Sequence, residues 1–179
     1  MAPWNGPNDE GEYRGELVTA RCQGIVYPSS EMQSKLMKSV YRDAGVDPTD
    51  VAFVELHATG TLIGDRQEAN SVTDVFCTER RSGPLLIGSV KTNMGHSEIS
   101  SGLSSLMKLI IAMQEHTIPP NLHFNIPSPE IPGLFDGRLK VITAVTTFVG
   151  RGGYRPTCVT FGILLPCNTF LCCKQYLNI

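Results

Sequence analysis

Residues 51–68, VAFVELHATGTLIGDRQE, contain an apolar run, a polar turn and the beginning of a helix. The first six residues, Val51–Leu56, have the length and the mainly apolar character of a buried strand. His57–Gly64 is rich in small and hydroxyl residues, and it predicts a turn. Asp65 is a candidate N-cap for a helix that we expect to end near Thr78, because Asp is a favoured capping residue.

The same order of strand and polar loop recurs in residues 85–98, LLIGSVKTNMGHSE. Leu85–Val90 predicts a second buried strand, and Lys91–Glu98 predicts a polar loop that contains a glycine. A helix is then expected from Ser100 or Ser101 to about residue 116, because apolar residues recur there at helical spacing. These apolar residues are Leu103, Leu106, Met107, Ile110 and Met113.

An earlier helix is predicted over Glu31–Ala44, where apolar residues recur at every fourth position. Either Ser29 or Ser30 can cap its start, and Gly45 is a natural end because glycine adopts left-handed backbone readily. The recurring apolar residues are Met32, Leu36, Val40 and Ala44.

Helices and strands therefore alternate along the chain. A short, partly β-branched segment at Arg21–Tyr27 precedes the first helix, and Leu139–Val145 has strand character after the irregular, proline-rich residues 119–137. Alternation of this kind predicts an α/β fold with parallel strands. Because polar sites in such folds lie beyond the carboxyl ends of the strands, the loops that begin at His57 and Lys91 are the places to expect one.

Each of these two loops carries one histidine among small residues and hydroxyls, His57 in the first and His96 in the second. A neutral imidazole can donate a hydrogen bond or accept a proton near neutral pH. Two imidazoles directed at one carbonyl oxygen would stabilise negative charge that develops there. A single loop histidine is more often a surface or packing residue, which is how we interpret His116 and His123.

Composition restricts the partners that this chain can have. Hydrophobic residues make up 41% and charged residues 18% of the 179 residues, which is typical of a globular protein. The net charge of −2 gives no basic surface for nucleic acid or for anionic membranes. No apolar run reaches the roughly 20 residues that span a bilayer, and residues 1–14 lack the apolar core of a signal peptide. We therefore expect a soluble, cytoplasmic protein.

The six cysteines do not change this expectation. Four of them lie in the last segment, and none forms the paired spacing with a second pair or with histidines that a metal site needs. We expect reduced cysteines and no metal site.

Three stretches resemble one enzyme family. VELHATGTLIGDRQE (54–68) resembles the VEAHGTGTxxGDPxE signature of type I β-ketoacyl synthases, and LLIGSVKTNMGHSE (85–98) resembles their SVKSNMGH motif. NLHFNIPSPEIPGLFDGRLKV (121–141) is similar to the segment that follows in animal fatty acid synthases. The resemblance is collinear from Gly24 to Val141 and weaker in residues 151–162. The chain thus resembles the carboxyl-terminal half of a β-ketoacyl synthase domain of animal fatty acid synthase type.

The resemblance implies a thiolase-like α/β fold, of which this chain would form the carboxyl-terminal half. Enzymes of this family join an acyl group held on a cysteine to a malonyl group, with loss of carbon dioxide. The malonyl group is carried on the phosphopantetheine of an acyl carrier protein. The resemblance implies that His57 and His96 assist decarboxylation and condensation and that Lys91 supports them. It also implies that Thr59 and Thr61 contact the phosphopantetheine arm.

This chemistry sets further expectations. Decarboxylation of malonyl leaves an enolate whose oxygen needs hydrogen-bond donors already in place, and a nearby buried lysine would keep the histidine pKa values low. No cofactor is expected to bind directly. The expected partners are an acyl carrier protein domain, acyl and malonyl thioesters and the amino-terminal half of the ketosynthase, in a protein that forms homodimers.

The chain departs from the family pattern in several places. No segment resembles DTACSS, which carries the family nucleophile, and neither Cys22 nor Cys77 has the turn setting that activates a thiolate. We therefore expect the isolated chain to catalyse no condensation. Ala58 replaces a glycine, which would cost about 1 kcal/mol if this position needs positive φ. Of the closing glycine loop, only Phe161-Gly162 is retained.

Three segments are expected on this basis: an irregular start at residues 1–20, the ketosynthase half at 21–162 and an aberrant, Cys-rich tail at 163–179. The leading hypothesis is fatty acid biosynthesis by decarboxylative condensation. A polyketide synthase ketosynthase is the nearest alternative, since its chemistry is almost the same. A catalytically inactive fragment that acts at most as an interaction module is an alternative of another class.

Overall fold

The computed structural model describes residues 29–79 and 81–147, together with the backbone of residues 160–161. The predicted strand at Arg21–Tyr27 and the segments 1–20 and 163–179 lie outside the described residues.

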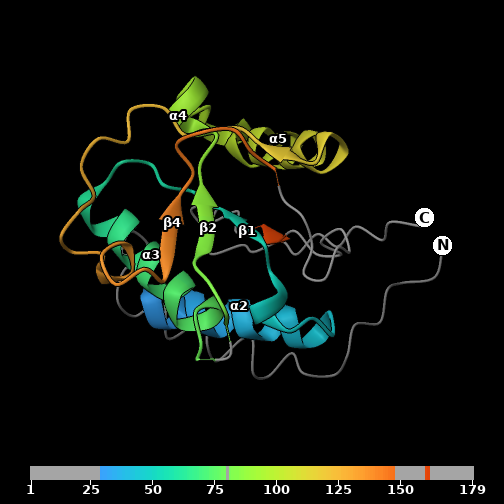
Figure 1. The fold of residues 1–179 in the computed structure, drawn as a ribbon, viewed down its shortest axis with the longest axis vertical. Helices are drawn as coiled ribbons and strands as arrows, with labels where there is room; N and C mark the ends of the chain where they lie inside the picture. The colour runs from blue at the N-terminus through green and yellow to red at the C-terminus, as the bar shows by residue number, and fades with distance from the viewer. Residues whose placement is uncertain (1–28, 80, 148–159, 162–179) are drawn as a thin grey trace.

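A parallel sheet of four strands forms the centre of the described structure (Figure 1), in the order β4-β2-β1-β6. Its strands are β1 (Phe53–Glu55), β2 (Leu85–Gly88), β4 (Leu139–Val141) and β6 (Thr160–Phe161). All three neighbouring pairs are parallel, with Val54 opposite both Ile87 and Thr160. The predicted parallel α/β arrangement is therefore confirmed. A separate antiparallel pair joins β3 (Thr117–Ile118) to β5 (Thr146–Thr147).

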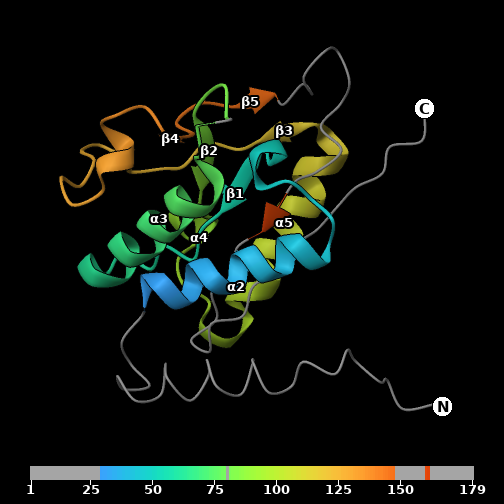
Figure 2. The ribbon, with the colours of Figure 1, turned by 90° about the horizontal axis from the view of Figure 1, so that it is seen from below.

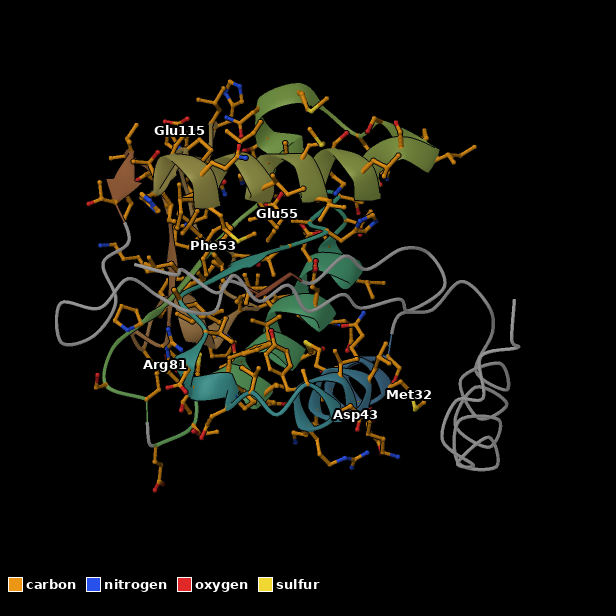
Figure 3. The ribbon with its side chains drawn as sticks, turned by 90° about the vertical axis from the view of Figure 1, so that its right-hand side faces the viewer. Met32, Asp43, Phe53, Glu55, Arg81 and Glu115 are labelled. Atoms are coloured by element: carbon orange, nitrogen blue, oxygen red, sulfur yellow. The ribbon has the colours of Figure 1, made fainter. Side chains whose placement is uncertain are left out.

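Helices cover both faces of this sheet. The helices are α2 (Ser30–Asp43), α3 (Leu62–Phe76), the single turn α4 (Lys91–Met94) and α5 (Ser101–Glu115). Short 3-10 turns occur at η1 (Pro48–Asp50), η2 (Glu98–Ser100) and η3 (Pro132–Leu134). Figures 1 and 3 show α2 and α3 on one side of the sheet and α5 on the other. Figure 2 shows α2 and α3 side by side, in agreement with their extensive contact.

Two apolar cores hold these layers together. The larger core joins α2 and α3 to the sheet, and in it the rings of Tyr41 and Phe76 pack edge to face with centroids 5.1 Å apart. The smaller core lies under α5 and consists of Phe53, Leu109, Met113, Ile118 and Ile142. Successive residues of a strand point to opposite faces, so Val54 belongs to the larger core and Phe53 to the smaller one.

The α2 helix follows its sequence signals at both ends. The Ser29 side chain caps the start by accepting a hydrogen bond from the Met32 backbone N–H at 3.4 Å. Gly45 has φ +62°, the left-handed conformation that ends a helix. The buried face differs from the predicted stripe, because Met37 and Tyr41 are 1% exposed.

Two boundaries predicted from the sequence were wrong. The α3 helix begins at Leu62 with Thr61 as its N-cap, so Asp65 lies within the first turn. Its carboxylate instead reaches back and accepts a hydrogen bond from the Gly60 backbone N–H at 3.2 Å. The expected loop 91–98 begins with the helical turn α4, whose end is made by Gly95 at φ +81°.

The α5 helix turns a partly polar face toward the sheet and a large apolar face outward. Its buried residues are Ser101, Ser105, Lys108, Leu109, Ala112 and Met113. Its exposed apolar residues are Leu103, Met107, Ile110 and Ile111, which together we call the α5 apolar stripe. Leu103 is 66% and Met107 55% exposed, although both were assigned to the apolar face of the predicted helix. Large contiguous apolar surfaces of this kind usually mark a contact surface.

Candidate active site

His57 is the second residue after β1, and a buried carboxylate holds its backbone in place. The two oxygens of Glu68, which is 4% exposed, accept hydrogen bonds from the His57 N–H at 2.6 Å and the Ala58 N–H at 2.9 Å. Glu68 belongs to α3, so the turn after β1 is tied directly to the helix that follows it. This contact fixes the position from which the imidazole of His57 extends.

His96 follows α4 on the neighbouring strand-end loop. Its Nδ1 accepts a hydrogen bond from the Glu98 backbone N–H at 3.0 Å. A neutral imidazole has one donor and one acceptor nitrogen, so Nε2 carries the proton in this arrangement. His96 therefore presents an N–H donor away from its own loop.

The two imidazoles meet across the edge of the sheet. Their ring centroids are 5.4 Å apart and the ring planes are 87° to one another. The expected proximity of His57 and His96 is therefore present. His57 is half-buried and His96 is exposed, so this pair is open to a ligand from the side of His96. Their roles in catalysis stay a prediction.

Lys91 begins α4 and acts electrostatically on His57. Its Nζ is buried and has no hydrogen-bond partner among the described residues. Burial lowers the Lys91 pKa, and the negative charges of Glu55, Glu68 and Asp65 partly oppose that effect. Burial first, and then the charges of Lys91 and His96, lower the His57 pKa from 6.5 to about 4. His57 is consequently neutral at pH 7.

The threonines predicted to contact a pantetheine arm lie in the turn after His57. Thr59 is half-buried and Thr61 is exposed, and the carboxylate of Asp65 holds the backbone of Gly60 between them. Ala58 has φ +34°, so the position does need the conformation that glycine adopts most easily. The strain that the sequence predicted is therefore present, at about 1 kcal/mol.

Three buried charged residues around the site were not predicted from the sequence: Glu55, Glu68 and Lys108. Glu68 is the last residue of the first motif, VELHATGTLIGDRQE, and Glu55 lies within the mainly apolar run Val51–Leu56. A signal for Glu55 did exist, because a charged residue inside a buried strand needs a buried partner. The partner is Lys108, which the sequence places at helical spacing among apolar residues of α5.

Two groups of this site give opposite pH dependences of stability. Burial raises the Glu68 pKa from 4.5 to about 7. Because this pKa is raised, the contribution of Glu68 to the free energy of unfolding is fully present below pH 4.5. It is lost as pH rises, by roughly 3 kcal/mol at pH 7. The His57 pKa is lowered, so the contribution of His57 to the free energy of unfolding is present above pH 6.5 and is lost as pH falls toward 4.

We therefore expect the difference in free energy of unfolding between the natural chain and Glu68→Gln to fall as pH rises from 4.5 to 7. The corresponding difference for His57→Asn should rise with pH from 4 to 6.5. Urea denaturation at half-unit pH steps measures both. A pH-independent difference for either variant would show that the group titrates normally in the folded chain.

Comparison with known proteins shows the family of this chain. The family model "Beta-ketoacyl synthase, C-terminal domain" matches residues 12–125, more than half of the chain. Highly reducing polyketide synthase ALT1 of Alternaria alternata is 51% identical over 134 residues, which are 74% of this chain and 5% of that protein. Hybrid PKS-NRPS synthetase pyvA of Aspergillus violaceofuscus is 44% identical over 142 residues, 78% of this chain and 4% of that protein.

Among solved structures, the ketosynthase from module 6 of the bacillaene synthase of Bacillus subtilis 168 superimposes with a TM-score of 0.68. It is 29% identical, and the match covers 77% of this chain and 24% of that one. The chain belongs to the β-ketoacyl synthase family and carries its carboxyl-terminal domain, with a thiolase-like fold. It spans a small part of the length of each relative named here.

The predicted fold class is confirmed, whereas the specific resemblance to animal fatty acid synthases is not. The relatives named above are polyketide synthases. Among the described residues, no helix is both long enough and apolar enough to cross a lipid bilayer.

Proposed function

We propose that this chain contributes the histidine pair of a polyketide-type ketosynthase, which condenses an acyl thioester with a malonyl thioester. The observation that carries the proposal is the pair itself: His57 and His96 face one another at 5.4 Å between ring centroids, with the buried charge of Lys91 nearby. The family membership of the chain supports the reaction class. The fatty acid alternative uses the same steps, and the named relatives favour polyketide synthesis.

In the proposed reaction the carbon–carbon bond to the malonyl carboxylate breaks and carbon dioxide leaves. The remaining electron pair forms an enolate, whose oxygen carries the developing charge. Neutral His57 and the Nε2–H of His96 are donors for that oxygen. The enolate carbon then attacks the acyl thioester and the cysteine thiolate is released.

The proposed roles of the remaining residues follow from their positions. Lys91 is proposed to stabilise the negative charge, and its ammonium adds to the effect of burial in lowering the His57 pKa, which keeps His57 neutral. Thr59 and Thr61, in the turn next to His57, are proposed to bind the phosphopantetheine arm of an acyl carrier protein. Their hydroxyls suit a polar, flexible ligand, and Thr61 is exposed.

The nucleophilic cysteine must come from another segment, because no DTACSS-like sequence occurs among the 179 residues. The α5 apolar stripe supports this division, since it offers a surface for a second α/β half to cover. Alone, the chain is proposed to be catalytically inactive. The alternative of an interaction module without catalysis uses the same surface but does not need the histidine pair.

Complementation tests the proposal. The full chain is mixed with an amino-terminal ketosynthase half that carries the cysteine, taken from a fungal polyketide synthase or from an animal fatty acid synthase. Size-exclusion chromatography reports assembly, and carbon dioxide release from malonyl-acyl carrier protein reports activity. We expect turnover in the assembled complex and greater turnover with the polyketide half. A complex that assembles but releases no carbon dioxide would favour the inactive interaction module.

A further inference from the structure

A buried ion pair at the end of β1 is not part of the proposed chemistry. Glu55 is 0% exposed and Lys108 is 8% exposed, and Lys108 Nζ lies 2.6 Å from Glu55 Oε2. Figure 3 shows Glu55 between β1 and α5. Glu55 points to the same face of β1 as Phe53, and Lys108 Nζ also lies 5.4 Å from the centre of the Phe53 ring. The pair therefore joins the middle of α5 to the last residue of β1.

The second oxygen of Glu55 connects to the neighbouring strand. Glu55 Oε1 accepts a short hydrogen bond from the backbone N–H of Val90. Val90 immediately precedes Lys91, and Glu55 lies two residues before His57. One carboxylate thus links the end of β1, the start of α4 and the buried face of α5. These are the elements that carry or adjoin all three residues of the candidate site.

A buried ion pair adds little net stability to a core. Removing two charges from water costs several kcal/mol per ion, and well-packed apolar residues are often as stable. The value of such a pair lies instead in its directional, charge-assisted hydrogen bonds, which allow fewer arrangements than apolar contacts do. The negative charge of Glu55 also opposes the effect of burial on Lys91. Position and charge at the site therefore depend on the same carboxylate.

We propose that Glu55 is a positioning residue: by accepting the hydrogen bond from the Val90 N–H it holds the two strand-end loops so that His57 and His96 face each other, and Lys108 compensates its buried charge. The relevance of this role to catalysis rests on the proposed function, but the geometry can be tested without turnover. Glu55 acts through Val90, which precedes Lys91, so it is a positioning residue rather than a catalytic one.

Two double variants separate the hydrogen bond to Val90 from mere core filling. Glu55→Leu with Lys108→Met removes both charges and also the acceptor for the Val90 N–H. Glu55→Gln with Lys108→Met removes the charges but leaves an amide oxygen that can accept from Val90. We expect the first variant to lose the contact between the two imidazoles and the second to retain it.

The contact is read by nuclear Overhauser effects between imidazole protons in the full chain with isotope-labelled histidine. The chain has four histidines, so His116 and His123 are internal references. Ser71→Ala is the matched control, since it removes a buried hydroxyl that bonds Gln33 on the opposite side of the sheet. It should lower stability without changing the His57–His96 signal. If the His57–His96 signal were lost equally in this control, Glu55 and Lys108 would only stabilise the fold in general and would have no specific positioning role.

Further outcomes also decide the proposal. An unchanged signal in the Leu/Met variant overturns it. If the Leu/Met variant does not fold, the test is made on the Gln/Met variant, in which hydrogen exchange at the Val90 amide is measured together with the histidine signal. Slow exchange together with a retained histidine signal supports positioning by the hydrogen bond, whereas slow exchange with a lost signal contradicts it. An intact signal in the natural chain without carbon dioxide release after assembly would refute the proposed function alone.

Discussion

Alanine at His57 or at His96 is expected to lower carbon dioxide release by the assembled ketosynthase by about 100- to 1,000-fold, the usual cost of losing one donor to a developing oxyanion. The expected loss is large because the imidazoles lie 5.4 Å apart, near enough for both to serve the same oxygen. The double variant should be little worse than either single one, because groups that act as a unit are not additive.

Substitutions elsewhere test whether the loss is specific. His116→Asn and His123→Asn are matched controls, since both histidines have positive φ, which asparagine tolerates. These variants should keep turnover within about twofold of the natural chain, because neither residue belongs to the proposed mechanism. Glutamine at position 57 keeps an N–H donor and should restore part of the activity. Full activity of His57→Ala would remove the histidine pair from the mechanism.

Polar substitutions on the α5 apolar stripe are expected to change how the chain associates. In the variant Leu103→Gln, Met107→Gln, Ile111→Gln, three side chains that are each at least half exposed lose their apolar character. Each contributes about 1.5–3 kcal/mol when it is buried against a partner. We therefore expect self-association of the isolated chain to weaken by at least about 100-fold. Assembly with an amino-terminal ketosynthase half should weaken in the same way.

Analytical ultracentrifugation over a range of concentrations measures the self-association. The control carries Glu31→Gln and Lys38→Gln on exposed positions of α2, across the sheet from the stripe. It should associate as the natural chain does. Unchanged association in the α5 variant would show that another surface makes the contact. Intact folding of this variant is expected, because none of the three residues belongs to either apolar core.

Much of the fold could be predicted because local signals agreed with one another. The apolar runs at β1 and β2, the Ser29 cap and the positive φ of Gly45 all have causes within a few residues of the chain. Their alternation with helices was enough to predict a parallel sheet. The site was predictable for a related reason: loops that follow neighbouring parallel strands emerge at the same edge, which brings His57 near His96.

Other features depend on contacts between residues far apart in the sequence. Glu68 was visible in a motif, but its two hydrogen bonds to the turn after β1 exist only when α3 packs beside that strand. The rotation of α5 about its axis is a similar case. Helical spacing predicts that one face is apolar, but it does not show which face packs against the sheet. Of the predicted apolar residues, Met113 is buried as expected, but Leu103 and Met107 are exposed, and Lys108 and two serines point inward.

Local propensity and periodicity predicted β1, β2, the main helices and the residue types at the sheet edge, whereas β3 and β5 were not predicted. Which charges are buried together depends on contacts that exist only in the folded chain. The partners Glu55 and Lys108 are 53 residues apart, and nothing local to either one identifies the other. The same holds for the pKa of His57, because burial and the charge of Lys91 act through space rather than along the chain.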